Sequence, residues 1–75
     1  MINETIKSAI EILGSQQKLA DACDVKQPSV WFWLHGKKRV SAKNAKCIEK
    51  ATYGKVPAYM IRPDLPDVFP HPTQD

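Results

Sequence analysis

Apolar side chains recur every three or four residues along most of the chain before Pro63, which is the spacing of one face of a helix. The pattern is densest between Gln17 and Leu34, where it falls on Leu19, Ala20, Cys23, Val25, Val30, Trp33 and Leu34. It is interrupted at Asp24, and Asp is one of the few residues other than Gly that tolerate a left-handed backbone. The stretch therefore predicts two short helices joined by a tight turn, a helix-turn-helix.

Capping residues divide the first half of this pattern into three helices, over about residues 3–13, 16–23 and 28–35. Asn3 and Ser15 precede the first two, and their side-chain oxygens accept hydrogen bonds from the free N–H groups of a first turn. Gly14 ends the first helix. Pro28 takes the first position of the third helix, where its missing N–H costs nothing.

Two further helical segments are expected. Ser41 caps a helix that ends at Gly54, and its inward positions are Ala45, Ile48 and Tyr53. A single turn begun by Pro57 then covers residues 56–61. Its apolar residues, which either close the core or supply a dimer surface, are Tyr59, Met60 and Ile61.

The chain changes character at Pro63, because four of its six prolines lie between there and the end. Proline at this density excludes helix and central strand. We therefore expect a helix-turn-helix domain over residues 1–62 and a Pro-rich tail, extended or disordered, over residues 63–75. Tail side chains that could dock onto the body or onto a second protomer are Leu65, Val68 and Phe69.

The length of 75 residues allows one domain, and a domain of this size buries only about 60% of its unfolded surface. A second copy would bury additional surface, so we expect a homodimer. The longest apolar run, Val30 to Leu34, is far too short to span a membrane. No basic-then-apolar signal pattern opens the chain, so we expect a cytoplasmic protein without a membrane partner.

The net charge of +3 hides a strongly basic middle. From Lys26 to Lys55 there are eight Lys or Arg residues against one acid, a balance of +7, whereas the segment from Arg62 to the end carries −2. A basic block on a folded core is typical of proteins that bind a polyanion such as nucleic acid. A solvated lysine surface is the alternative.

The second helix of the motif carries the candidate base-reading residues. Lys26 and Gln27 lie at its start, where Gln can pair with adenine and Lys with guanine. The positions that follow on its outward side and flank are Pro28, Trp31, Phe32 and His35. Two large aromatic residues on a face expected to be polar need a reason. They could contact thymine methyl groups or sugar edges, one could form a dimer contact, or one could pack against the tail.

Phosphate contacts have separate candidates, because they position a protein on DNA without specifying sequence. Gln16 and Gln17 lie at a helix N-terminus, whose free N–H groups favour anions. The basic turn after the reading helix suits a phosphate clamp. The full predicted set is Gln16, Gln17, Ser29, His35, Lys37, Lys38 and Arg39.

Cys23 and Cys47 are too few for a disulfide framework, and with His35 and His71 they lack the spacing of a zinc site. We expect both thiols to be structural, with no metal and no other cofactor. No Ser/His/Asp or Cys/His grouping shares a face, so we expect no catalytic residues and no enzyme.

Several stretches of the sequence resemble one family: GSQQKLADACDV, QPSV, WLHGKKRVSAKN and IEKATYGKVPAYMIRPDL, within about Gly14 to Leu65. In these stretches the chain resembles the Cro-like, YdaS-type helix-turn-helix repressors of prophages and lambdoid phages. The segment from Ile61 to Leu65 resembles that family's LRPDL signature, which is more specific than a generic helix-turn-helix.

The resemblance implies a lambda-repressor-like core of about five helices that binds an operator, usually as a dimer. It places a backbone role on Gln17 and base-reading roles on Lys26, Gln27, Pro28, Trp31 and Phe32. The chain departs from the family pattern at Asp24, which replaces the common Gly of the turn, and at Trp31 and Phe32, which replace usually small or polar residues. The prolines after Arg62 argue against the variant in which a β-hairpin replaces the last helices.

These expectations describe a Cro-type phage or prophage regulator that represses by occupying a pseudo-palindromic operator in double-stranded DNA, on the nucleoid of a bacterial host. Two alternatives remain open. One is an antitoxin with the same DNA-binding core and a tail that folds onto a toxin. The other is a small phage adaptor that grips host proteins through Trp31 and Phe32.

Overall fold

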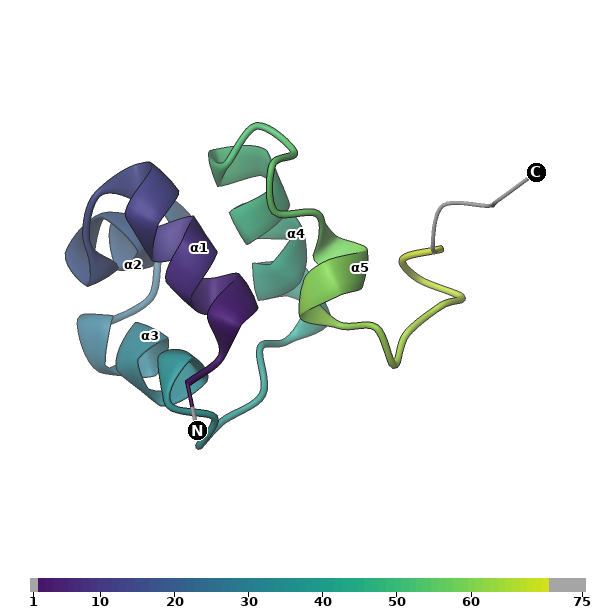
Figure 1. Cartoon of the computed structure of the whole chain (residues 1–75), viewed down its shortest axis with the longest axis horizontal. Helices are drawn as coiled ribbons and strands as arrows, with labels where there is room; N and C mark the ends of the chain where they lie inside the picture. Colours follow the sequence, from purple (N-terminus) through teal and green to yellow (C-terminus); the bar gives the residue numbers. More distant parts are fainter. Residues whose placement is uncertain (1, 71–75) are drawn as a thin grey trace.

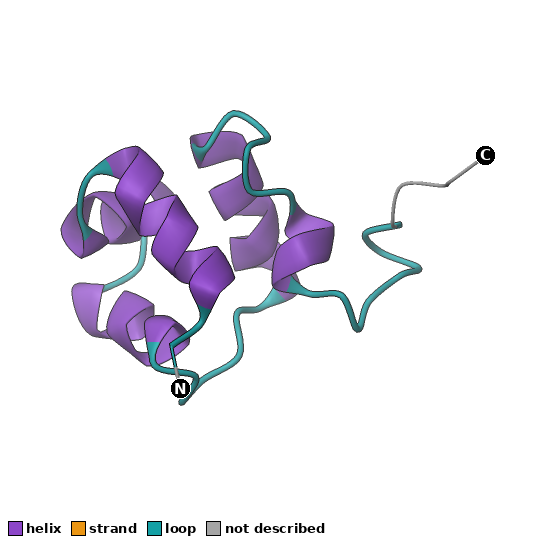
Figure 2. Cartoon of the chain, in the orientation of Figure 1, coloured by secondary structure: helices purple, strands orange, loops and turns teal. Residues whose placement is uncertain are grey.

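The computed structural model describes residues 2–70, and this part of the chain contains five helices and no strand (Figures 1 and 2). The helices are α1 (Glu4–Leu13), α2 (Gln16–Cys23), α3 (Gln27–Leu34), α4 (Ala42–Ala51) and α5 (Ala58–Ile61). Helices α1, α2 and α3 lie together at one end, α4 and α5 lie beside them, and residues 63–70 continue away from α5 (Figure 1). The predicted all-α fold with a central helix-turn-helix is confirmed.

The predicted helix caps are present. The side chain of Asn3 accepts hydrogen bonds from the backbone N–H groups of Thr5 and Ile6, at 3.1 and 3.2 Å. Ser15 and Ser41 cap α2 and α4 in the same way. Each such cap stabilises a helix by about 1 kcal/mol, so the sequence itself sets where these helices begin.

The turn of the helix-turn-helix forms at Asp24, whose φ of 55° is left-handed as predicted. The next helix differs slightly from the prediction, because α3 begins at Gln27 and Pro28 is its second residue. Proline is tolerated anywhere in the first turn, since those N–H groups have no partner within the helix. The helix ends at Leu34, and His35 is its C-cap residue rather than its last residue.

The core is shared by all five helices and the loops before α4 and α5. Its buried residues are Ile6, Ala9, Leu19, Ala20, Cys23, Val30, Trp33, Val40, Ala45, Ile48, Val56, Ala58 and Ile61. Helix α2 packs most extensively, against α3 and α4. Because Val30 and Trp33 anchor α3 in this core, the opposite side of that helix faces outward.

The predicted inward position of Tyr53 is wrong. Its side chain is 91% exposed, and its φ of 56° shows that the chain has already left the helix. The helical face through Ala45 and Ile48 continues to Thr52, four residues after Ile48. The Thr52 side chain is fully buried. The Thr52 hydroxyl donates to the carbonyl of Ile48 at 2.9 Å and accepts from the N–H of Val56 at 3.1 Å. A polar residue therefore fixes the turn between α4 and α5.

The short helix α5 divides its apolar residues between core and surface. Ile61 is buried in the core, Tyr59 is half-buried, and Met60 is exposed. The N–H of Ala58, at the start of α5, donates to a carboxylate oxygen of Glu49 at 2.8 Å. That hydrogen bond, with a second from Lys46, lowers the pKa of Glu49. Ile61 thus closes the core, and Met60 remains available to a partner.

The described part of the tail, residues 63–70, makes consecutive turns rather than the extended path that we expected. The N–H groups of Val68 and Phe69 donate to the carbonyl of Leu65 at 3.2 and 2.8 Å. Phe69 packs against the core, Leu65 is half-buried and Val68 is exposed. Proline excludes helix here but not turns. The domain boundary at residue 62 stays a prediction, and residues 71–75 of the tail lie outside the described residues.

Candidate nucleic-acid interface

The helix-turn-helix brings the N-termini of α2 and α3 together. The side-chain amide of Gln27, at the first position of α3, donates to the amide oxygen of Gln16, at the first position of α2, at 2.6 Å. Both side chains are half-buried. An amide has two N–H donors and one carbonyl acceptor, so this bond leaves Gln27 with one donor and its oxygen for an outside group. The start of α3 therefore presents an oriented amide.

Gln17 lies in a different environment from Gln16, although the sequence pattern treated them alike. Its side chain is exposed, and its amide donates to the Asp21 carboxylate at 2.8 Å, one turn later on the same helix. Lys26, the N-cap residue of α3, is exposed and makes no side-chain capping bond. Pro28 is exposed next to it, and Ser29 is half-buried. The predicted base-reading residues at the start of α3 are therefore consecutive, with Lys26 and Pro28 exposed and Gln27 half-buried between them.

The rings of Trp31, Phe32 and His35 form a connected group on the outward side of α3 and at its C-terminal end. Trp31 is 38% exposed and stacks on His35 with ring centroids 4.1 Å apart. Its ring also meets the edge of Phe32 at 5.5 Å. The ammonium group of Lys38 lies over the Phe32 ring, 5.3 Å from its centroid, a distance typical of a cation–π contact. The last turn of α3 thus presents an aromatic surface with a cation at its edge.

One of the three roles considered for these aromatics does not occur in residues 63–70. In Figure 1 residues 63–70 lie at the far end of the molecule from α3, so these residues do not cover that helix. The ring partners of Trp31 are instead its own helical neighbours Phe32 and His35. Contact with DNA and contact with a second protomer both stay predictions.

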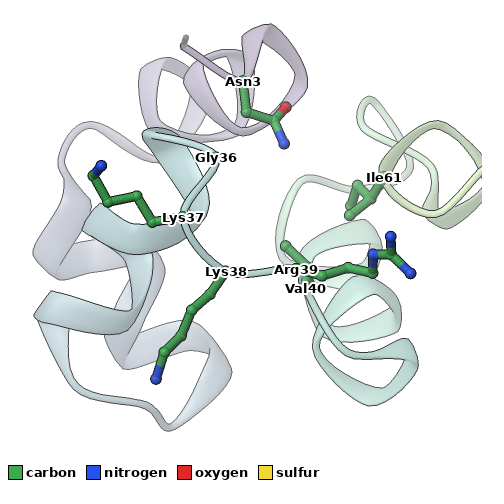
Figure 3. Close-up of a pocket in the computed structure, with 7 residues that line it drawn as sticks. All are labelled: Asn3, Gly36, Lys37, Lys38, Arg39, Val40 and Ile61. Atoms are coloured by element: carbon green, nitrogen blue, oxygen red, sulfur yellow. The ribbon is translucent and has the colours of Figure 1, made fainter.

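The basic turn folds back onto the end of α3. The backbone N–H groups of Lys37 and Lys38 both donate to the carbonyl of Phe32, at 2.9 and 3.3 Å. Behind the turn lies an open groove of about 420 Å³, lined by Asn3, Gly36, Lys37, Lys38, Arg39, Val40 and Ile61. Its basic side chains do not converge: Lys37 and Lys38 point away from the groove, and Arg39 points toward α5 (Figure 3). The turn therefore offers separate cations rather than one clamp.

Arg62 and Asp64 form contacts near the basic turn that the sequence prediction did not include. Arg62 donates through Nε and Nη2 to the two carboxylate oxygens of Asp64, each at 2.9 Å, and through Nη1 to the carbonyl of Val40 at 2.8 Å. The Arg39 guanidinium lies 3.5 Å from the same carboxylate. The Arg62 hydrogen bonds lower the pKa of Asp64 to about 2. The signature-like segment at residues 61–65 thus ties the C-terminal turn to the basic turn.

Other chemistry is limited in the part of the chain that the structure describes. No group of three or more His, Cys, Asp or Glu side chains there could hold a metal ion. Both cysteines are free thiols. Burial raises the pKa of Cys23 to about 11, which keeps its thiol protonated near neutral pH. Within residues 2–70, no helix has the length and apolar character needed to cross a membrane.

Comparison with known protein families shows to which family the chain belongs. A family model described as "Bacterial toxin YdaS" matches residues 6–70, which include all of α2 to α5 and the Arg62–Asp64 segment. The chain belongs to the YdaS family. The resemblance seen in the sequence is confirmed at the level of the family.

One relative of this YdaS-family chain has a regulatory description. It is the Escherichia coli K12 protein named "Putative transcriptional regulator YdaS", which is 35% identical over 63 residues. The match covers 84% of the chain and 64% of the relative, so the chain spans under two thirds of the relative's length. No solved structure matches the chain. The family description and the relative's name thus point to two different activities, toxin and regulator.

Proposed function

We propose that this YdaS-family chain is a sequence-specific DNA-binding transcriptional regulator, without catalytic activity, that reads DNA through α3. The observation that carries the proposal is the Gln27–Gln16 hydrogen bond. It holds a bidentate-capable amide at the exposed start of the second helix of a helix-turn-helix, which is where such motifs contact base edges. The basic balance of +7 between Lys26 and Lys55 provides the attraction to phosphates.

The proposed base-reading surface comprises the first turn of α3 and its aromatic end. Gln27 pairs with the N6 and N7 edge of adenine, and Lys26 favours guanine O6 and N7. Pro28, exposed beside them, contacts the groove wall. Trp31 and Phe32 contact thymine methyl groups, which are the apolar feature of the major groove, or the sugar edges of the backbone.

The proposed phosphate contacts lie on both sides of that surface. On α2 and α3 they are Gln16, Gln17, Ser29 and His35; on the basic turn they are Lys37, Lys38 and Arg39. Lys38 is placed best, because its ammonium group over Phe32 keeps it next to α3. Contacts of this kind fix the protein's position on the duplex and carry no sequence information.

The regulator is proposed to act as a Cro-type phage or prophage repressor, a dimer that blocks a promoter by occupying a pseudo-palindromic operator. The dimer surface is proposed on α5 and the tail, at Tyr59, Met60, Leu65 and Val68. Exposed Met60 and Val68 support this choice. Ile61 and Phe69 support this surface from the inside, because Ile61 is part of the core and Phe69 packs against it.

A binding selection from random duplex DNA at about 150 mM salt tests the proposal. A two-fold symmetric enriched site, with half-sites about one helical turn (~34 Å) apart, is the expected result. Absence of any enriched site, together with steep salt dependence, would show that the basic block only attracts polyanions. That result would favour the adaptor alternative, in which Trp31 and Phe32 bind a host protein.

The description of the family as a toxin favours a second activity, growth inhibition. We propose that any such inhibition works through promoter occupancy rather than through a separate chemistry. Induced expression should then slow growth for the unsubstituted protein and for a variant that still binds its operator, but not for Gln27→Ala. Equal inhibition by Gln27→Ala would separate toxicity from DNA reading. Co-purification of a second protein with the tail would instead support the antitoxin alternative.

Lys38→Ala should weaken binding to all duplexes alike and lower the salt slope of log K by about 0.9, because one phosphate contact is lost. The slope is measured from affinities at several salt concentrations on the enriched site and on a scrambled duplex. Lys43→Ala is the matched control, since it removes an exposed lysine from α4 instead of one beside α3. An unchanged slope for Lys38→Ala would remove that side chain from the interface.

A further inference from the structure

Arg62 and Asp64 have no role in the function proposed above, yet they form a polar network with Arg39 and the Val40 carbonyl. Arg62 is its centre. Three of its guanidinium nitrogens donate, two to Asp64 and one to the Val40 carbonyl, at 2.8 to 2.9 Å. Its side chain is only 13% exposed. Each guanidinium nitrogen of Arg62 therefore makes a hydrogen bond, and together they fix the Asp64 carboxylate next to the loop that leads from the basic turn into α4.

Arg39 approaches the same carboxylate in a different way. It makes a single contact with Asp64, at 3.5 Å, and its side chain is 73% exposed. Arg62 already compensates the charge of Asp64 at shorter distance. An exposed ion pair of this kind contributes little to stability. Arg39 can therefore leave Asp64 at small cost, whereas Arg62 cannot.

A carboxylate held by a guanidinium has the same geometry as a phosphate held by one, because the planar guanidinium fork matches both groups. Arg39 also lines the open groove behind the basic turn, and its side chain points toward α5, away from Lys37 and Lys38 (Figure 3). It is thus a cation separate from Lys38, already paired with an oxyanion in the free protein.

We propose that Asp64 stands in for a backbone phosphate: Arg62 fixes Asp64, Asp64 holds Arg39, and a phosphate of bound DNA replaces Asp64 as the partner of Arg39. This inference rests on the proposed DNA binding and assigns positioning roles to Arg62 and Asp64. Because the Arg39–Asp64 contact must break on binding, Asp64 weakens binding to every DNA sequence alike.

Asp64→Asn tests the exchange. It removes the competing charge, so affinity for duplex DNA should rise by about two- to five-fold, the range expected for one exposed ion pair. The salt slope should become steeper by up to about 0.9. Asp67→Asn is the matched control: it removes the same charge from the same segment, and Asp67 makes no hydrogen bond or ion pair within residues 2–70. Its effect should be smaller.

An Arg39→Ala background decides whether Asp64 acts through Arg39. In that background Asp64→Asn and Asp67→Asn should change affinity equally. As a separate single variant, Arg39→Lys should keep the salt slope that Arg39→Ala loses. An Asp64→Asn effect that persists without Arg39, or one no larger than that of Asp67→Asn, would overturn the exchange. If Asp64→Asn does not fold, an unchanged salt slope for Arg39→Ala alone overturns it.

Different results would contradict the phosphate exchange at Arg39 and the proposed DNA binding. Measurements on an enriched site and on a scrambled duplex should show the same Asp64→Asn effect, because the exchange involves phosphate only. Duplex binding without coupling between Arg39 and Asp64 contradicts this inference and leaves the proposed function standing. Absence of duplex binding by the unsubstituted protein contradicts both.

Discussion

Replacing Gln27 by alanine is expected to cost about 1–3 kcal/mol of binding free energy on the preferred operator, or about 5- to 150-fold in affinity, and to relax discrimination at one base pair. The side chain at this position is held at 2.6 Å from Gln16, so it meets the base edge with its conformation already fixed. Affinity for a scrambled duplex should change little. The measurement is a competition series in which each base pair of the enriched site is changed in turn.

Two other glutamines provide the controls for Gln27→Ala. Gln16→Ala frees the Gln27 amide without removing it, so discrimination at the same base pair should fall by less. Gln17→Ala removes an exposed side chain whose hydrogen-bond partner within residues 2–70 is Asp21, so it should affect all sequences alike. Full discrimination by Gln27→Ala would mean that another residue reads the sequence.

Thr52→Val is expected to destabilise the fold by about 1–3 kcal/mol, because the buried N–H of Val56 loses its acceptor while the shape of the side chain is kept. In a domain of this size each kcal/mol lowers Tm by about 4–8 °C. The turn between α4 and α5 should loosen first, since the Thr52 hydroxyl joins its two ends. Thermal unfolding followed by circular dichroism measures the loss.

Thr5→Val is the matched control for this substitution. Thr5 is half-buried in α1, and its hydroxyl makes no hydrogen bond within the described residues. The same chemical change there should move Tm by little. If both variants unfold at the temperature of the unsubstituted protein, the Thr52 hydroxyl does not fix the turn.

The elements that local chemistry determines could be predicted from the sequence. The caps at Asn3, Ser15 and Ser41 and the turn at Asp24 depend on residues within a few positions of one another, and all four are present. The side of α3 that enters the core was also predictable, because Val30 and Trp33 have helical spacing. The residues that determine each of these features lie within one or two helical turns of one another.

Contacts between distant positions could not be predicted in the same way. The bonds from Gln27 to Gln16 and from Arg62 to Val40 join residues 11 and 22 positions apart. Nothing in periodicity distinguishes Gln16 from Gln17, since both are polar and adjacent. The error at Tyr53 has a different cause, because the contacts involved are local: the prediction turned Tyr53 inward, whereas the turn places the hydroxyl of Thr52 inside.

The division of α3 into a buried and an exposed side bears on how new binding preferences arise among relatives. Val30 and Trp33 hold the helix in place, while Lys26, Pro28 and Trp31 are exposed and can be exchanged with little effect on folding. Gln27 is the exception, because its partner lies on α2. A graft of preference from one family member to another must therefore carry position 16 together with position 27.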